Sequence, residues 1–217
     1  MNQHINDMPD EELMRLVQQG RLDAFEVLAR RYENKFVNFL YRFVGNRSIA
    51  EDICQQAFLK IYRNRNKYRN TGKCSTWMYT VVANLARDWL RKNKRFVFVS
   101  LDAPVNENTE IIDFYESPEP SSSKKLENKE TARVVQKAVD SLPKHQKLAV
   151  ILSHYDNLNY SDIAKIMGCS KGTVKSRIFR AKSRLKEMLT AYIAGKEGLA
   201  KDEMLESNES VTGIFGQ

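Results

Sequence analysis

The side chains best able to do covalent or metal chemistry are few and widely separated in this 217-residue chain. Its cysteines and histidines are Cys54, Cys74, Cys169, His4, His145 and His154. They form no Cys-x-x-Cys pair and no set at metal-ligand spacing, and neither a Ser/His/Asp set nor a pair of carboxylates stands out. We therefore predict reduced, partly buried cysteines, no metal site, no cofactor and no enzymatic activity.

Positive charge is the second kind of chemistry that the sequence concentrates. Between Lys171 and Lys186 there are seven Lys or Arg residues and no Asp or Glu. A solvated helix usually mixes the two signs, because unlike charges three or four residues apart stabilise it and like charges do not. The segment therefore indicates a helix face that meets a negatively charged partner.

A second basic segment runs from Lys60 to Arg95, with eleven Lys or Arg residues and Asp88 as its single acid. Five aromatic residues lie among these bases: Tyr62, Tyr68, Trp77, Tyr79 and Trp89. The mixture suits single-stranded nucleic acid, because nucleobases stack on aromatic rings while Lys and Arg bind phosphates. The alternative is that both tryptophans belong to the core, which we favour for Trp77, and that the bases are merely solvated.

Helical periodicity dominates the elements that must position these residues, and strand-like alternation is almost absent. Pro9 and the acidic residues after it begin a short helix that Gly20 ends. A long apolar stripe at steps of three and four follows, and we assign it to the core. Its members are Phe25, Leu28, Tyr32, Phe36, Phe39, Leu40 and Phe43. The fold class predicted from these patterns is all-α.

Residues 48–51 form a capping box, with Ser48 as the cap of the next helix. One face of that helix carries the apolar residues Ile53, Ala57 and Ile61. The opposite face carries Asp52, Gln55, Gln56 and Leu59, for which plain solvent exposure is the simplest interpretation. Further on, residues 66–76 are predicted to form a loop. Residues 77–95 are predicted to form a helix with Trp77, Val81 and Leu85 turned inward.

Residues 159–188 follow the pattern of a helix-turn-helix. Asn159 caps its first helix, Gly168 ends that helix, and Ser170 caps the second. The buried face of the second helix is predicted to be Val174, Ile178, Ala181, Leu185 and Met188. Phe179 falls well away from this stripe, and an exposed aromatic on a basic helix is best explained by contact with DNA. In such a motif the second helix enters the major groove, so the bases at 171–186 are predicted to face DNA.

Charge divides the chain into four parts. Residues 1–95 carry a net charge of +8 and residues 124–195 carry +9, whereas residues 96–123 carry −6 and residues 196–217 carry −3. The acidic middle part contains several Pro and Ser residues, which is typical of a linker. We predict two small helical domains at 1–97 and 125–195, a flexible acidic linker at 98–124, and a disordered acidic tail at 196–217.

Composition also indicates the cellular compartment in which the chain acts. Apolar residues make up 42% and charged residues 29% of the sequence, as in a soluble globular protein. No stretch approaches the roughly 18 apolar residues of a membrane span, and the first residues lack a signal-peptide pattern. We expect a cytoplasmic protein with no membrane insertion of its own.

Three blocks of the sequence, taken in order, resemble sigma factors of the extracytoplasmic function (ECF) type. AEDICQQAFLKIYRN resembles region 2.2 of that family, and STWMYTVVANLARDWLRKNKR resembles its regions 2.3 and 2.4. SLPKHQKLAVILSHYDNLNYSDIAKIMGCSKGTVKSRIFRAKSRLK resembles region 4. The resemblance covers roughly residues 10–190. It implies a region 2 bundle, a region 4 helix-turn-helix, and promoter-specific initiation of transcription by bacterial RNA polymerase.

The resemblance also implies three surfaces on this chain. A surface for core polymerase, at the β′ clamp helices, comprises Asp52, Gln55, Gln56 and Leu59. A surface for the melted −10 strand comprises Tyr68, Lys73, Trp77, Asn84, Arg87, Trp89, Arg91 and Lys92. The family captures a flipped base in this part of the chain. A surface for the −35 duplex comprises Lys171, Thr173, Lys175, Ser176, Arg177, Phe179 and Arg180.

Partners follow from the resemblance alone. They are core RNA polymerase, through its β′ and β subunits, promoter DNA, and an anti-sigma factor that holds the chain inactive until a signal arrives. The acidic linker would thread toward the RNA exit path. The chain departs from the family at Gln56, where a carboxylate is common, and at Thr80, where Arg is usual. One charged polymerase contact and one strand or packing contact are therefore expected to differ.

Two other classes of protein remain as alternatives. An autonomous helix-turn-helix repressor or activator would explain residues 159–188, but it would leave the aromatic and basic segment 60–95 without a purpose. A nucleic-acid enzyme such as a resolvase would need a nucleophile supported by carboxylates or Arg, and the sequence offers no such set.

Overall fold

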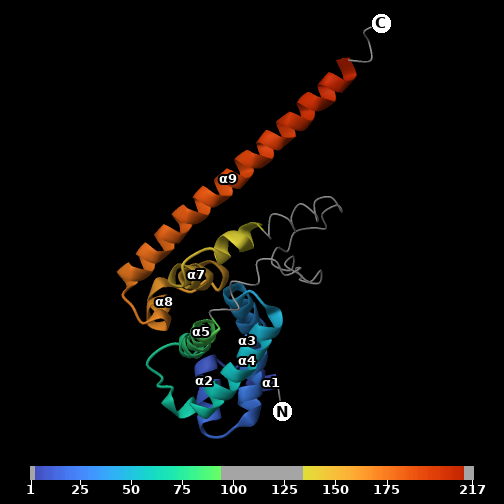
Figure 1. The fold of residues 1–217 in the computed structure, drawn as a ribbon. Helices are drawn as coiled ribbons and strands as arrows, with labels where there is room; N and C mark the ends of the chain where they lie inside the picture. The colour runs from blue at the N-terminus through green and yellow to red at the C-terminus, as the bar shows by residue number, and fades with distance from the viewer. Residues whose placement is uncertain (1–2, 94–133, 213–217) are drawn as a thin grey trace. The chain divides into compact units, whose positions relative to one another are not determined.

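A computed structural model describes residues 3–93 and 134–212, and every regular element in these ranges is helical (Figure 1). The predicted acidic linker at 98–124 lies outside the described residues. The chain divides into two compact units. Unit 1 consists of the described residues of 1–109 and 143–178, and unit 2 of those of 110–142 and 179–217.

The first part of unit 1 is a helical bundle centred on α3. Its elements are α1 (Gln3–Asn6), α2 (Asp10–Gln18), α3 (Leu22–Val44), α4 (Arg47–Arg63), the 3-10 turn η1 (Arg65–Lys67) and α5 (Cys74–Lys92). The predicted apolar stripe on α3 is confirmed, since all its members are buried except Phe25, which packs at the edge of the core. Helices α2, α4 and α5 each pack against α3.

The turn between α3 and α4 depends on Gly45 and Asn46. Gly45 closes α3 with φ of +83°, a left-handed conformation that glycine adopts without steric cost, and its N–H donates to the Tyr41 carbonyl. The Asn46 side chain accepts a hydrogen bond from the Ile49 N–H at 3.0 Å and is the cap of α4. The predicted cap at Ser48 is therefore wrong, because the helix begins at Arg47.

Helix α5 begins earlier and faces the core differently from the prediction. It starts at Cys74, whose N–H donates to Glu11 Oε1 on α2 at 3.0 Å. Its buried residues are Cys74, Thr76, Met78, Tyr79, Val82, Ala83, Ala86 and Leu90. The predicted inward residues Trp77, Val81 and Leu85 are only half-buried. The Tyr79 ring sets this register, because it packs edge-on against Phe36 and Phe39 at 5.1 and 5.8 Å.

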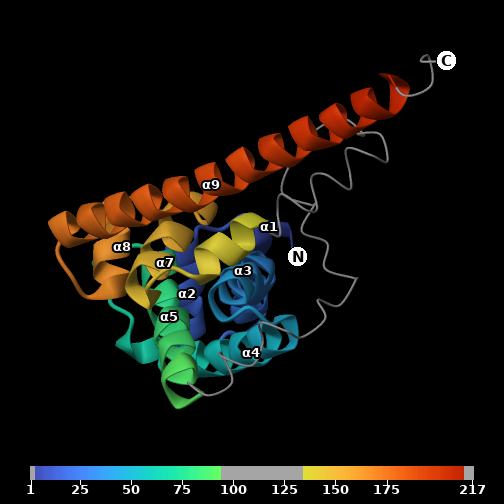
Figure 2. The same ribbon diagram turned by 45° about the horizontal axis from the view of Figure 1, so that its top comes forward.

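The second part of unit 1 packs on α5. It contains α7 (Lys144–Val150), the π-helical turn η3 (Ile151–Tyr155), α8 (Tyr160–Met167) and the N-terminal part of α9 (Lys171–Thr212). Helix α8 contacts α5, and the two lie close together in Figures 1 and 2. The turn η3 contacts α3. Unit 1 therefore contains residues from both of the domains predicted from the charge distribution, 1–97 and 125–195.

Unit 2 consists of a short helix at 134–140 and the rest of α9. Ala138, Val139 and Leu142 are buried, and Ser141 Oγ lies 3.2 Å from Met188 Sδ on α9. Helix α9 continues to Thr212, through residues for which a disordered tail was predicted. Ten of the seventeen residues at 196–212 are Glu, Lys, Leu, Ala or Met and none is proline, so the composition favours a helix despite its acidity.

Candidate polymerase and nucleic-acid surfaces

The four residues predicted to bind polymerase share one exposed face of α4. Asp52, Gln55, Gln56 and Leu59 are all exposed, at the i, i+3, i+4 and i+7 positions that bring side chains together on a helix. Ile53, Ala57 and Ile61 are buried on the opposite side, as predicted. Leu59 is 57% exposed, which is unusual for a leucine beside a well-packed core. The helix therefore offers a polar face with one apolar side chain to a partner.

The loop before α5 is held in a defined shape. The Gln18 amide donates to the carbonyls of Arg65 and Tyr68, both at 2.9 Å. The Tyr68 hydroxyl donates to the Gly72 carbonyl at 3.0 Å, and its ring packs against Trp77. Tyr68 is 6% exposed, so the structure places it in the core rather than on the predicted strand-binding surface.

The other residues predicted for the −10 strand line the outer side of α5 and its N-terminus. Lys73, Asn84, Arg91 and Lys92 are exposed, and Trp77, Arg87 and Trp89 are half-buried. A hollow of about 410 Å³ opens beside Trp77. It is lined by Lys67, Tyr68, Arg69, Thr71, Gly72, Lys73, Thr76, Trp77, Thr80 and Lys165. Basic side chains around one partly exposed indole match the chemistry of a nucleobase site.

The helix-turn-helix forms as its caps predict. The Asn159 side chain accepts from the Asp162 N–H at 2.9 Å, and Ser170 Oγ accepts from the Thr173 N–H at 3.1 Å. Gly168 ends α8 with φ of +63°. Val174, Ile178 and Ala181 are buried on α9, while Leu185 and Met188 are half-buried.

The residues predicted for the −35 duplex lie on the other sides of α9. Lys171, Lys175, Phe179 and Arg180 are exposed, and Thr173, Ser176 and Arg177 are half-buried. Phe179 is 72% exposed. The structure thus presents an aromatic ring and several bases to solvent along the N-terminal part of the second helix.

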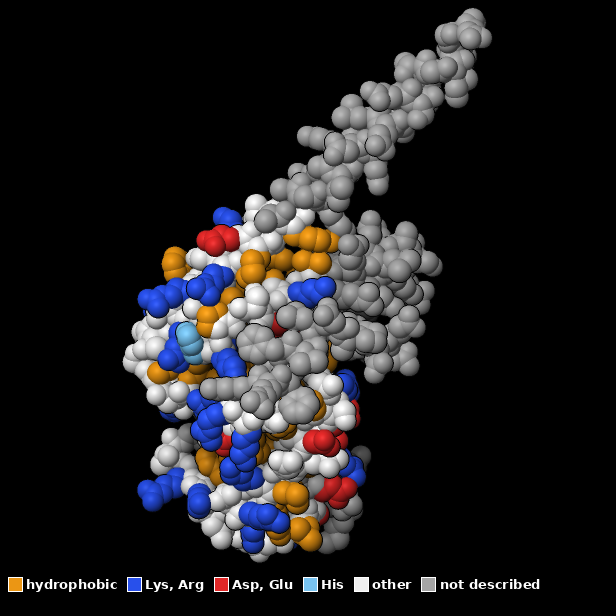
Figure 3. All heavy atoms as spheres, viewed as in Figure 1, with side chains coloured by type: hydrophobic (Ala, Val, Ile, Leu, Met, Phe, Trp, Pro, Cys, Tyr) orange, Lys and Arg blue, Asp and Glu red, His pale blue; other side chains and the backbone are white. Residues whose placement is uncertain are grey.

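Within unit 1, two of the predicted −10 residues contact the helix-turn-helix. Lys73 Nζ lies 3.3 Å from Asp162 Oδ2 on α8, where the Asp162 side chain is almost fully buried. Arg87 Nη2 donates to the Ile166 carbonyl, also on α8, at 3.4 Å. Lys and Arg side chains gather over α5, α8 and the start of α9 in Figure 3, with few acidic side chains among them. The basic face of α5 is therefore partly covered.

A third contact between α5 and this second part is the hydrogen bond that Tyr79 OH donates to Asp156 Oδ1 at 2.9 Å. Burial raises the pKa of Asp156 to about 6, although the hydrogen bond from Tyr79 and the charges of Arg42 and Lys35 act in the other direction. The second carboxylate oxygen of Asp156 is buried without a hydrogen-bond partner in the described residues. When Asp156 is ionised, its buried charge therefore lowers the stability of this contact between helices.

The cysteines show the chemistry of core residues. Cys54 and Cys74 are buried, and burial raises the pKa of each thiol to about 12, so both stay protonated and unreactive near neutral pH. Cys169 is half-buried. Among the described residues, no group of three His, Cys, Asp or Glu side chains is placed to hold a metal ion.

Sequence patterns did not single out several residues at these sites. Lys165 on α8 lines the hollow beside Trp77, and Asp156 and Asp162 contact α5 from a distant part of the chain. Lys144 and His145 line a second hollow, which also contains Arg87 and Arg177. These residues carry no motif, and only the packing of residues 143–178 on α5 reveals them. No helix in the described ranges is long and apolar enough to cross a membrane.

Two family comparisons match separate parts of the chain. Residues 28–96 match the sigma-70 region 2 family, and residues 132–185 match the sigma-70 region 4 family. The first range holds the α4 and α5 surfaces, and the second holds the helix-turn-helix.

Curated relatives cover most of the chain. The RNA polymerase sigma-H factor of Pseudomonas aeruginosa is 32% identical over 184 residues, which are 83% of this chain and 93% of that protein. The ECF RNA polymerase sigma-E factor of Haemophilus influenzae is 33% identical over 183 residues, 84% and 96% of the two chains. The sigma-E factor of Escherichia coli K12 is 32% identical over 182 residues, 82% and 93% of the two chains.

Solved structures share the fold. CnrH in complex with the cytosolic domain of CnrY matches with a TM-score of 0.62 and 18% identity, over 84% of this chain and 97% of that one. The sigma factor RpoE in complex with the anti-sigma factor NepR, from Bartonella quintana, matches with a TM-score of 0.58 and 24% identity. That match covers 76% of this chain and 96% of the other.

Proposed function

The chain belongs to the extracytoplasmic function (ECF) sigma factors of the sigma-70 family, and we propose that it directs bacterial RNA polymerase to specific promoters. One observation carries the proposal. A single chain holds an exposed α4 face, an aromatic and basic α5, and a helix-turn-helix with an exposed basic side. The autonomous-regulator alternative accounts for the third feature only.

Each surface has a distinct role in this proposal. The α4 face, which is Asp52, Gln55, Gln56 and Leu59, binds the β′ clamp helices of core polymerase. The exposed part of α5 binds the melted −10 strand, with Asn84 hydrogen-bonding a flipped base and Lys and Arg contacting phosphates. Helix α9 reads the −35 duplex in the major groove.

Promoter binding requires unit 1 to open. The −35 and −10 elements are about 25 base pairs apart, which is roughly 85 Å at 3.4 Å per pair. Arg87 of the proposed −10 surface and Arg177 of the proposed −35 surface line the same cavity in this structure. They cannot serve both elements at once from these positions. We infer that the contacts between α5 and residues 143–178 separate when polymerase and promoter bind.

The remaining partners and the location also belong to this proposal. Two related folds are bound to other proteins, CnrH to the cytosolic domain of CnrY and RpoE to the anti-sigma factor NepR. By analogy, an anti-sigma factor holds this chain inactive. The chain acts in the cytoplasm beside polymerase, and it contributes no catalytic chemistry of its own.

Reconstitution with core polymerase tests the proposal directly. Duplex promoter DNA is offered to the chain alone, to core polymerase alone and to the mixture, and complexes are separated by gel electrophoresis. We expect a specific complex and strand melting with the mixture only. Specific binding by the chain alone, unchanged by polymerase, would instead support the autonomous regulator.

The −35 assignment has its own test, made with the reconstituted enzyme on −35 variants at several salt concentrations. Arg180 lies near the start of α9, and Arg180→Ala should cost about 1–3 kcal/mol at particular −35 positions. Lys182 lies further along, and Lys182→Ala should weaken all sequences alike and lower the salt dependence by about one counterion. Equal profiles for the two variants would contradict this division of roles.

A further inference from the structure

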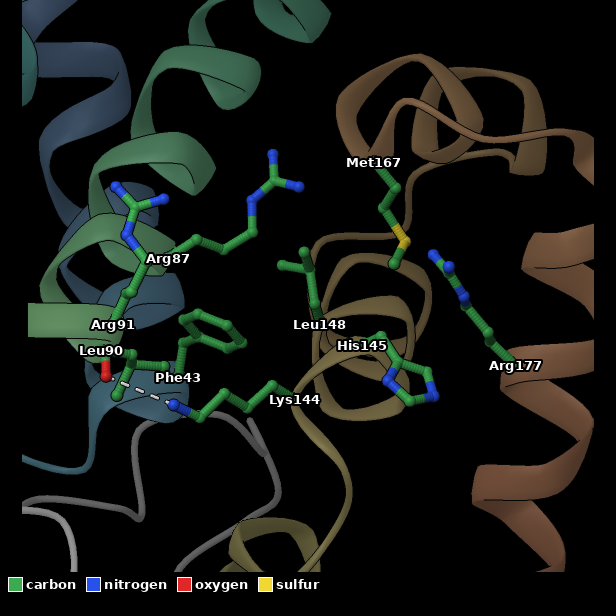
Figure 4. A pocket seen from close by; sticks show the side chains of 9 residues that line it. All are labelled: Phe43, Arg87, Leu90, Arg91, Lys144, His145, Leu148, Met167 and Arg177. Carbon is green, nitrogen blue, oxygen red and sulfur yellow. Dashed lines mark hydrogen bonds between the residues drawn. The ribbon is translucent and has the colours of Figure 1, made fainter. Parts of the chain in front are cut away.

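A cavity of about 390 Å³ lies within unit 1 where α5, α7, α8 and the N-terminal part of α9 meet (Figure 4). Sites for small molecules in proteins usually measure about 300–1,000 Å³. The lining residues are Phe43, Arg87, Leu90, Arg91, Lys144, His145, Leu148, Met167 and Arg177. The cavity therefore has the size of a ligand site, an apolar wall and a ring of basic side chains.

The basic side chains around the cavity come from three helices. Figure 4 shows Arg87 reaching into the space from α5 and Arg177 reaching toward it from α9 on the opposite side, with His145 and Lys144 on α7. Among the described residues that line the cavity, none is acidic. Like charges around one cavity repel each other, and a bound anion lowers that cost.

The hydrogen bonds of these side chains leave their charge largely uncompensated. Lys144 Nζ donates to the Leu90 carbonyl at 3.3 Å, and Arg177 Nη1 donates to Cys169 Sγ at 3.5 Å. Arg87 donates to the Ile166 carbonyl at 3.4 Å, and also to the Ala83 carbonyl and the Asn84 side chain. All these acceptors are neutral. A carboxylate, that of Asp88, pairs with Arg91 at 3.0 Å.

DNA binding alone does not account for the arrangement. Arg87, Arg91 and Arg177 belong to the predicted DNA surfaces, so their charge has an explanation. Lys144 and His145 belong to neither surface, yet both side chains complete the ring from α7. A ring that is assembled only when the helices pack together points to an anion that binds the packed form.

We propose that this cavity binds a small polyphosphate anion, a nucleoside diphosphate or triphosphate. Its phosphates lie among Arg87, Lys144, His145 and Arg177, which supply charge-assisted hydrogen bonds. Its base lies against the apolar wall that includes Leu148 and Met167. Such a ligand touches α5 on one side and α7 and α9 on the other. It therefore stabilises the packed form of unit 1 and withdraws Arg87 and Arg177 from DNA.

Calorimetric titration of the full chain tests the binding, with GDP, ADP, sodium pyrophosphate and guanosine as probes at constant ionic strength. We expect one saturable site that binds a nucleoside diphosphate more tightly than pyrophosphate and guanosine least. Lys144→Gln and His145→Ala should each weaken binding by about tenfold, because each removes a hydrogen bond to a charged group. Both positions are exposed, so both variants should fold.

Arg30→Gln on α3 is the matched control, because it removes one positive charge from an exposed side chain far along the sequence from the cavity residues. It should bind like the unmodified chain. Heats that never saturate, or equal losses in the control and in Lys144→Gln, would overturn the proposal and leave the cavity as part of the DNA surface.

The consequence for DNA rests on the proposed function and is measured separately, with the reconstituted polymerase and a fluorescent −10 strand. GDP should weaken strand binding for the unmodified chain and have about tenfold less effect on Lys144→Gln. Saturable GDP binding without any effect on the strand would overturn the coupling. If the strand fails to bind with or without GDP while calorimetry shows the site, the proposed function fails and the ligand site stands.

Discussion

The outer face of α4 and the basic face of α5 belong to one helical bundle, but they differ in how they are covered. Asp52, Gln55 and Leu59 on α4 are exposed to solvent. On the second surface, Lys73 and Arg87 contact α8 from the helix-turn-helix. The surface proposed for polymerase is ready for use in this structure, whereas the surface proposed for the −10 strand is partly occupied by the chain itself.

This difference predicts how much rearrangement each partner requires. Docking of polymerase on α4, as proposed, would need no rearrangement of unit 1, because the four side chains already share one open face. On the proposed −10 surface, a strand that uses Lys73 and Arg87 would have to displace their contacts with α8. We therefore expect polymerase docking to require less rearrangement of unit 1 than strand binding along the whole of α5.

The largest effect is expected on α4. Replacing Asp52, Gln55 and Leu59 together by Ala should weaken binding to core polymerase by about a hundredfold or more, since central interface residues often contribute 2 kcal/mol or more. The melting temperature should change by only about 1–2 °C, because exposed substitutions rarely alter stability. A matched set on α3, Glu26→Ala with Arg30→Ala, should leave polymerase affinity unchanged. If the α4 variant binds polymerase as tightly as the unmodified chain, these residues do not form the polymerase surface.

The next effect concerns the cost of Asp156 at the covered surface. The pKa of Asp156 is raised from 3.8 to about 6 by burial, so the folded chain binds a proton that the unfolded chain releases between these values. The contribution of Asp156 to the free energy of unfolding therefore favours the folded state at low pH, and this stabilisation is lost as the pH rises through about 6. Asp156→Asn keeps an acceptor for Tyr79 and removes the charge. At pH 7.5 it should stabilise the chain by about 2 kcal/mol.

Denaturant unfolding of both proteins from pH 4 to 8 measures this contribution. The difference in unfolding free energy between Asp156→Asn and the unmodified chain should grow as the pH rises from about 4 to 7 and then level off. Other carboxylates titrate in both proteins and cancel in the difference. A constant difference across this range would show that Asp156 does not titrate there, and the cost assigned to the covered surface would be wrong.

The two surfaces also differ in how far the sequence predicts them. The α4 face follows from local periodicity, and its four residues are exposed. The caps at Asn159, Gly168 and Ser170 are likewise local and are confirmed. On α5, the predicted inward residues Trp77, Val81 and Leu85 pack only at the edge of the core, because the edge-on packing of Tyr79 against two α3 aromatics sets the register. Such a constraint joins residues about forty positions apart, which a local pattern does not contain.

Tyr68 and the covering of α5 show the same limit. Aromatics beside bases indicate nucleic acid, yet Tyr68 is held in the core by bonds to its own loop. No sequence pattern links α5 to Asp156 or Asp162, since each contact pairs residues more than seventy positions apart. At 196–212 two sequence signals differ, because net charge predicts disorder whereas helix propensity favours the helix to which α9 extends.

A smaller effect should come from Tyr79→Phe, which removes one hydroxyl and keeps the ring that packs on Phe36 and Phe39. The buried Asp156 then loses its hydrogen bond, so the contact between α5 and η3 weakens. Binding of a −10 strand to the reconstituted enzyme should tighten by about tenfold, while polymerase affinity stays the same. Tyr62→Phe serves as the control. Unchanged strand affinity would mean that the contacts between α5 and residues 143–178 do not limit access of the strand to α5.

The smallest effect is expected at Asn84, which is exposed on the part of α5 that α8 leaves open. Arg87 donates to Asn84 Oδ1, which leaves the amide NH₂ directed away from that bond and able to donate to a base. Asn84→Ala should therefore cost about 1 kcal/mol, roughly fivefold, at one −10 position in an open-complex assay on promoter variants. Lys92→Ala removes a phosphate contact and should weaken every variant alike, with a lower salt dependence. If both substitutions give one profile across the variants, Asn84 reads no base, and the open part of α5 only positions the strand.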